Sequence, residues 1–133
     1  MAERLAVEEG SRTEWRRTFT VADVRAFSDV SGDRGIHHVD LDGAGRLMVQ
    51  GLLTATLPTK LGGDLNYLAR DMHFEFLRPV FTGDEVLCVS VCTRAERQPG
   101  RTYAEFAIAC TNPAGKEVLR ATVAGVILDS GSA

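Results

Sequence analysis

Residues 48–57 (MVQGLLTATL) decide the fold, because they form an apolar run of helical length with few polar side chains. A helix that is apolar nearly all round belongs in the interior of a protein. Pro58 is expected to end or kink this helix, and Gly62 with Gly63 to complete the break. A single short, buried helix needs a sheet large enough to wrap around it.

The second half of the chain supplies such a sheet. Four segments rich in β-branched or alternating apolar residues are predicted to be strands: 70–80, 85–96, 102–111 and 117–128. In the first of them, Met72, Phe74 and Phe76 fall on one face. Turn sequences at 98–100 and 112–115 separate the last three segments. A long antiparallel meander is therefore expected.

The first half of the chain is mainly helical. Residues 11–19 favour a short strand or extended arm, and Thr20 is placed to open a helix with Asp23 completing a capping box. Residues 31–33 (SGD) should end that helix. The order of strand, helix, loop, buried helix and meander predicts an α+β fold in one domain spanning residues 1–133, with 1–10 as a flexible arm.

Composition narrows the range of functions. The chain has 133 residues, which suits one domain, and a net charge of -3 without a basic cluster, which argues against a nucleic-acid partner. The N-terminus resembles no secretory signal and no apolar run reaches membrane-spanning length, so a cytoplasmic protein without a membrane partner is expected. Cys88, Cys92 and Cys110 lie in strand-like segments and are predicted to be core residues, not disulfide or metal ligands.

Residues 31–40 (SGDRGIHHVD) contain the side chains best suited to catalysis. Two glycines make the segment a loop, which brings the carboxylate of Asp33 and the imidazole of His38 together. An acid and a histidine side by side can act as general acid and general base in catalysis. Asp33 alone could instead be an ordinary turn residue after a helix. His37 is the expected surface histidine of the pair. His73 is expected to be a partly exposed structural residue.

Three blocks of sequence resemble one family. Residues 31–40 are similar to the pattern S-G-D-x-N-P-I-H-x-D, residues 50–53 (QGLL) to H-G-M/L-L, and residues 76–84 (FLRPVFTGD) to F-x-x-P-V-x-x-G-D. In this order the blocks resemble the MaoC-like hydratase/dehydratase family, the (R)-specific enoyl-thioester hydratases with the HotDog fold. The similarity runs from about residue 19 to residue 127. Two departures are Gly35-Ile36 in place of Asn-Pro and Gln50 in place of histidine.

The resemblance implies a reversible addition of water to a trans-2-enoyl thioester, and the reverse dehydration of an (R)-3-hydroxyacyl thioester. Asp33 and His38 would share the reacting water. The backbone N–H of Gly51 would stabilise the developing enolate oxygen. Gly35 and Gln50 are expected beside the substrate. Asp40 would orient the Asp33/His38 pair or cap the next turn.

The resemblance also implies the partners. The substrate would be an acyl-CoA or acyl-carrier-protein thioester whose chain enters a tunnel along the buried helix. No metal or cofactor is required for this chemistry. Two protomers would join their sheets edge to edge, with the site at the interface of a homodimer. Arg78 could meet a phosphate of the carrier group, or could be a solvated residue at the end of a strand.

Two other functions stay open at the level of sequence. HotDog thioesterases usually place an acid on the buried helix, and residues 48–61 contain neither Asp nor Glu, which counts against thioester hydrolysis. A non-catalytic subunit that binds acyl thioesters is compatible with the departures at Gly35, Ile36 and Gln50.

Overall fold

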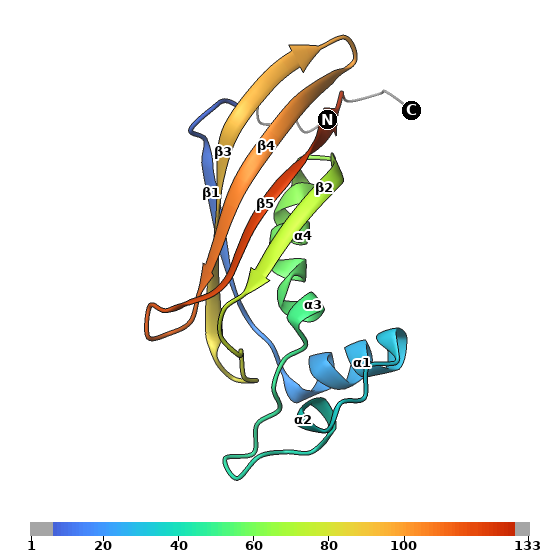
Figure 1. Ribbon diagram of the computed structural model, residues 1–133, viewed down its shortest axis with the longest axis vertical. Coiled ribbons are helices and arrows are strands. Elements are labelled where there is room, and N and C mark those ends of the chain that lie inside the picture. Colours follow the sequence, from blue (N-terminus) through green and yellow to red (C-terminus); the bar gives the residue numbers. More distant parts are fainter. Residues whose placement is uncertain (1–6, 130–133) are drawn as a thin grey trace.

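One curved sheet wraps around two consecutive helices in the computed structural model, which describes residues 7–129 (Figure 1). The five strands are β1 (Arg12–Thr18), β2 (Tyr67–Phe76), β3 (Glu85–Gln98), β4 (Arg101–Thr111) and β5 (Glu117–Leu128). The helices are α1 (Val21–Ser31), α2 (Ile36–Val39), α3 (Gly51–Thr54) and α4 (Thr56–Asp64). Helices α3 and α4 lie against one face of the sheet, whereas α1 and α2 lie beyond one end of it (Figure 1).

The sheet is antiparallel throughout, with the strand order β1-β3-β4-β5-β2. Its centre is the predicted meander of β3, β4 and β5, joined by tight turns in which Gly100 and Gly115 have positive φ angles of 76°. The helical first half, the buried helix and the meander confirm the α+β prediction. Strands β1 and β2 form the two edges of the sheet.

Strand β2 differs from its predicted span of 70–80. It begins at Tyr67 and ends at Phe76, after which residues 77–80 leave the sheet. Pro79 has no N–H for a ladder hydrogen bond, and the carbonyl of Val80 accepts from the N–H of Val49 at 2.7 Å. Residues 77–80 therefore run alongside the segment that leads into α3.

The central helix also differs from its predicted span of 48–57. It begins at Gly51, breaks at Ala55 and continues to Asp64, so Pro58 bends the helix without ending it. Pro58 is the third residue of α4, where the backbone N–H needs no helical partner. The expected break at the two glycines was wrong, because both lie inside α4. Leu52 is 64% exposed, so the helix is not buried all round.

The core lies between the sheet and these helices. Phe19, Leu47, Leu57 and Leu119 are completely buried there. The indole N–H of Trp15 donates to the carbonyl of Leu57 at 2.8 Å, which ties edge strand β1 to α4. The three cysteines are buried and free, as predicted; they are Cys88, Cys92 and Cys110. No helix within residues 7–129 has the length and apolarity needed to cross a membrane.

Helix α1 begins with the predicted capping box. The Thr20 hydroxyl accepts from the Asp23 N–H, and the Asp23 carboxylate accepts from the Thr20 N–H at 2.9 Å. The helix ends at Ser31 and is capped by Gly32, which adopts the left-handed conformation with φ 78°. Of the expected N-terminal arm, residues 1–6 lie outside the described part of the chain, and the Gly10 N–H donates to the Cys92 carbonyl of β3.

Candidate functional site

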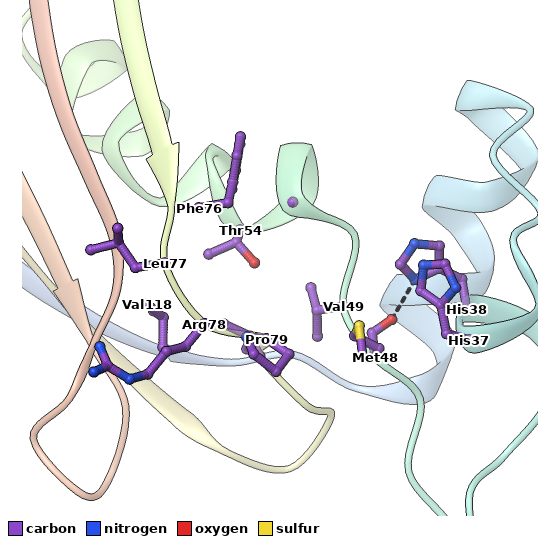
Figure 2. A pocket seen from close by; sticks show the side chains of 12 residues that line it. His37, His38, Met48, Val49, Thr54, Phe76, Leu77, Arg78, Pro79 and Val118 are labelled. Carbon is purple, nitrogen blue, oxygen red and sulfur yellow. Dashed lines mark hydrogen bonds between the residues drawn. The ribbon is translucent and has the colours of Figure 1, made fainter.

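A cavity of about 430 Å³ opens between α2, the start of α3 and the extended residues 77–80. Twelve residues line it, and Figure 2 draws them: His37, His38, Met48, Val49, Gly51, Thr54, Phe76, Leu77, Arg78, Pro79, Val80 and Val118. The two histidines lie at one end of the group and Arg78 at the other (Figure 2). Most of the wall between them is apolar.

The chain brings Asp33 and His38 together, as the spacing predicts. Nε2 of His38 lies 3.6 Å from Oδ2 of Asp33. The His38 side chain is 7% exposed and that of Asp33 is 49% exposed, so the pair spans the boundary between cavity and solvent. Asp33 itself is not among the residues that line the cavity.

The tautomer of His38 follows from its second nitrogen. Nδ1 lies 2.6 Å from the backbone carbonyl oxygen of Met48, which can only accept, so Nδ1 carries the hydrogen (Figure 2). In the neutral ring, Nε2 is then an acceptor that faces a carboxylate. Two acceptors cannot hydrogen-bond to each other, but both can accept from one water molecule placed between them. Such a water would donate both of its hydrogens and keep its lone pairs free.

The loop before α2 holds the carboxylate in position. The Gly35 N–H donates to Oδ1 of Asp33 at 3.2 Å, and the Asp33 N–H donates to the Ser31 hydroxyl at 3.0 Å. The Ser31 hydroxyl in turn donates to the Phe27 carbonyl of α1. A side chain at position 35 would collide with His37, because an added Cβ would lie 2.8 Å from Cε1 of that ring. The absence of a side chain at Gly35 therefore lets the His37 ring lie against the backbone in its present position.

Residues 36–39 form one turn of helix where sequence reasoning expected an uninterrupted loop. This turn buries His38 and leaves His37 more exposed, with the two ring centroids 3.8 Å apart. His37 nevertheless lines the cavity. The side chain of Asp40 makes no hydrogen bond or ion pair with any residue in the described range 7–129. The structure therefore does not bring Asp40 to the pair.

Gly51 lies where a substrate could reach its backbone. It is the first residue of α3 and lines the cavity. A Cβ added there would lie 3.0 Å from Cε1 of Phe76, so the absence of a side chain lets the aromatic ring rest against the helix. The N–H groups of a first helical turn have no partner within the helix, which leaves the Gly51 N–H available as a donor.

Gln50 and Gly35 do not line the cavity, although both were expected to lie beside the substrate. The Gln50 amide nitrogen donates to the Val24 carbonyl at 3.0 Å and to the Ser28 hydroxyl at 2.9 Å, both in α1. Its side chain therefore points away from the cavity and ties the start of α3 to α1. The Gly35 N–H is already engaged by Asp33. Of the three expected binding residues, Gly51 alone lines the cavity.

Three other residues singled out in the sequence, His73, Arg78 and Asp84, lie as follows. His73 is an exposed residue of β2, 3.9 Å from Glu75. Arg78 lines the cavity and donates through its guanidinium to the Glu117 carbonyl at 2.7 Å. Asp84 follows Gly83 in a turn closed by a hydrogen bond from its own N–H to the Phe81 carbonyl.

Sequence reasoning missed two features of the site. The Met48 carbonyl fixes the His38 ring, but a backbone partner ten residues away leaves no mark in the sequence. Thr54 lines the cavity one turn after Gly51, and this spacing of three residues on a helix was a usable signal.

Comparison with known proteins identifies the class. A family model described as the thioesterase superfamily matches residues 50–112, somewhat less than half of the chain. The structure of an (R)-hydratase from A. caviae involved in PHA biosynthesis superposes with a TM-score of 0.81 and 26% identity, covering 93% of this chain and 98% of that one. A comparison with curated protein sequences yields no match.

Two further structures share the fold at lower identity. A MaoC-like dehydratase from Rhodospirillum rubrum has a TM-score of 0.75 at 20% identity, covering 93% of this chain and 94% of that one. A chain of the HadBC (3R-hydroxyacyl-ACP dehydratase) complex from Mycobacterium tuberculosis has a TM-score of 0.68 at 16% identity, covering 89% and 96%.

The antiparallel sheet wrapped around a central helix is thus a HotDog fold. Within that class, the structural neighbours of the chain include MaoC-like dehydratases and (R)-hydratases, which confirms the resemblance seen in the three sequence blocks.

Proposed function

We propose that the protein catalyses the reversible hydration of trans-2-enoyl thioesters, and the reverse dehydration of (R)-3-hydroxyacyl thioesters. The observation that carries this proposal is the approach of Nε2 of His38 to 3.6 Å from the Asp33 carboxylate at the edge of an apolar cavity. The similarity to an (R)-hydratase at 26% identity supports the same reaction.

The proposed reaction uses a water molecule held by two acceptors, Nε2 of His38 and the Asp33 carboxylate. A water molecule that donates to both Nε2 of His38 and Asp33 directs a lone pair toward C3 of the enoyl group. As the C3–O bond forms, the π electrons of the C2=C3 bond move toward the thioester oxygen. One member of the pair takes a proton from the water, and the pair returns a proton to C2. The pair thus ends in its starting protonation state, and the elements of water have been added across the double bond.

The negative charge that develops on the thioester oxygen needs a donor. The Gly51 N–H is free of a helical partner and lies on the cavity wall, so we assign it this role. Losing one such donor typically lowers kcat by about 10²–10³. The apolar side chains between Gly51 and Arg78 would cover the acyl group, and burying such a group releases water from both surfaces.

A homodimer would enclose this cavity. Edge strand β2 exposes Leu68, Met72 and Phe76, and Leu52 of α3 is also exposed. An exposed, apolar edge strand is a ready site for pairing with another chain. Phe76 belongs both to this edge and to the cavity wall, so covering the edge with a second protomer would also close the cavity. The native mass of the assembly tests this part of the proposal.

One assay tests the reaction. The purified protein is mixed with crotonyl-CoA, and both the absorbance of the enoyl thioester and the release of free thiol are followed. Loss of absorbance without thiol, together with an (R)-3-hydroxybutyryl product, is the expected result. Thiol release would indicate a thioesterase instead. Binding without either change, at short and long chain lengths alike, would indicate a non-catalytic acyl-binding subunit.

A further inference from the structure

Thr54 places a hydroxyl group in the wall of the cavity. The residue is 3% exposed and lines the cavity from α3, whose other members are a glycine and two leucines. In Figure 2 its oxygen points into the space between α3 and residues 77–80. Across the described residues 7–129, no hydrogen-bond partner is found for this hydroxyl. The residue is buried from bulk solvent, so its hydroxyl is accessible from the cavity, where a ligand atom can bond to it.

Two neighbouring threonines show that the missing bond is specific to Thr54. The hydroxyl of Thr56 donates to the Leu53 carbonyl at 2.6 Å, and that of Thr59 donates to the Ala55 carbonyl at 3.2 Å. Threonine in a helix commonly makes this bond to a carbonyl three or four residues back. Thr54 does not make it, so its hydroxyl remains available to a molecule in the cavity.

The surroundings of Thr54 suit an acyl chain, apart from this single hydroxyl. Val49, Phe76, Leu77 and Pro79 are the other cavity residues on this side (Figure 2). We propose that the Thr54 hydroxyl recognises an oxygen atom carried by the acyl chain of the substrate, either a hydroxyl or a carbonyl, beyond the reacting carbons. The preferred substrates are then oxygenated enoyl or 3-hydroxyacyl thioesters and not plain hydrocarbon ones. This inference rests on the proposed function.

The spacing along the helix indicates where that oxygen lies. Residues three apart on a helix are neighbours on one face at about 5–6 Å, and Gly51 and Thr54 have this spacing. With the thioester oxygen at Gly51, the second oxygen would therefore lie about that distance along the chain. Three single-bond steps of a backbone span about 3.8 Å, so four or five bonds cover the separation. An extended acyl chain places an oxygen on C4, five bonds from the thioester oxygen, at this distance. An oxygen on C5 is six bonds away and reaches the same position when the chain is bent.

Binding of saturated thioesters tests the inference without requiring turnover. Hexanoyl-CoA, 5-hydroxyhexanoyl-CoA and 5-oxohexanoyl-CoA are titrated calorimetrically into the wild-type protein and into Thr54→Val, Thr54→Ser and Thr59→Val. Valine keeps the shape of threonine without its hydroxyl, and serine keeps the hydroxyl. Thr59→Val is the matched control, because it removes an exposed hydroxyl of α4 that lies outside the cavity.

We expect wild type to bind at least one of the oxygenated thioesters roughly three- to tenfold more tightly than hexanoyl-CoA, the effect of one hydrogen bond. Thr54→Val should abolish this preference, whereas Thr54→Ser and Thr59→Val should keep it. Equal binding of all three thioesters by wild type would overturn the inference and leave the proposed function standing. A preference that survives in Thr54→Val would also overturn it. Failure of the folded protein to bind any of them would overturn the proposed function and, with it, this inference.

Discussion

Gln50 offers a sharp test of how the site is supported. It is 1% exposed, its amide nitrogen makes both hydrogen bonds to α1, and its Oε1 has no partner among the described residues. Gln50→Ala would remove two hydrogen bonds worth about 0.5–1.5 kcal/mol each, and would leave a void in the core. We expect a loss of about 2–4 kcal/mol in the free energy of unfolding.

Gln50→Met separates the cost of the void from the cost of the lost hydrogen bonds. Methionine fills nearly the same volume, so little or no void forms, and it also removes the unpaired Oε1, whose burial costs about 1–3 kcal/mol. These gains offset the two lost hydrogen bonds, and the net change should stay within about 1 kcal/mol of wild type. Urea-induced unfolding followed by circular dichroism measures both variants. Because both variants remove Oε1, they differ mainly in the void, and equal losses for methionine and alanine would refute the role assigned to the void. A loss for methionine well above about 1 kcal/mol would refute the offset assigned to the unpaired Oε1.

Three other predictions concern the elements around the site. Thr20→Ala removes the N-cap of α1 and should lower the free energy of unfolding by about 1 kcal/mol, measured by denaturant unfolding. The hydrogen bond from the backbone N–H of Thr20 lowers the pKa of Asp23 below the ordinary value of an aspartate. Asp23 therefore stabilises the fold fully above that ordinary pKa and loses its effect as the pH falls through the lowered pKa. The stability gap between wild type and Asp23→Asn should therefore narrow at acid pH; a gap independent of pH would contradict this. Met72→Lys places a charge on the exposed edge of β2 and should shift the native mass toward the monomer in analytical ultracentrifugation, whereas an unchanged mass would exclude this edge from the dimer interface.

Local signals in the sequence predicted much of the fold. The capping box of Thr20 and Asp23 acts over four residues, and the alternation in β3, β4 and β5 reports directly on which face is buried. The central helix was harder to predict, because proline breaks helices in their interior but is tolerated in a first turn. Pro58 has no N–H for the Thr54 carbonyl, which fits the break at Ala55, but the sequence does not show that the helix restarts at once and runs on to Asp64.

The site, like the fold, has parts that the sequence predicted and parts that it did not. The spacing of Asp33 and His38 within one loop was sufficient to predict that they meet. The orientation of Gln50 was not predictable, because neighbouring elements decide which way a side chain points, whereas the helical spacing from Gly51 was a usable signal for Thr54. Gln50 turns toward α1, where a carbonyl and a hydroxyl accept from it, and Thr54 faces a cavity formed partly by residues 77–80.

The most direct test of the proposed chemistry compares two aspartates of the same segment. Asp33→Asn removes a carboxylate acceptor of the shared water. Asp40→Asn changes an exposed acid whose side chain makes no hydrogen bond or ion pair with His38 or any other described residue. Initial rates of crotonyl-CoA hydration are measured for both variants beside wild type, with circular dichroism as the check on folding. We predict that Asp33→Asn lowers kcat by about 10²–10⁴, the range for a general acid–base group, and that Asp40→Asn stays within about twofold of wild type. A folded Asp33→Asn variant with near wild-type turnover would contradict the account.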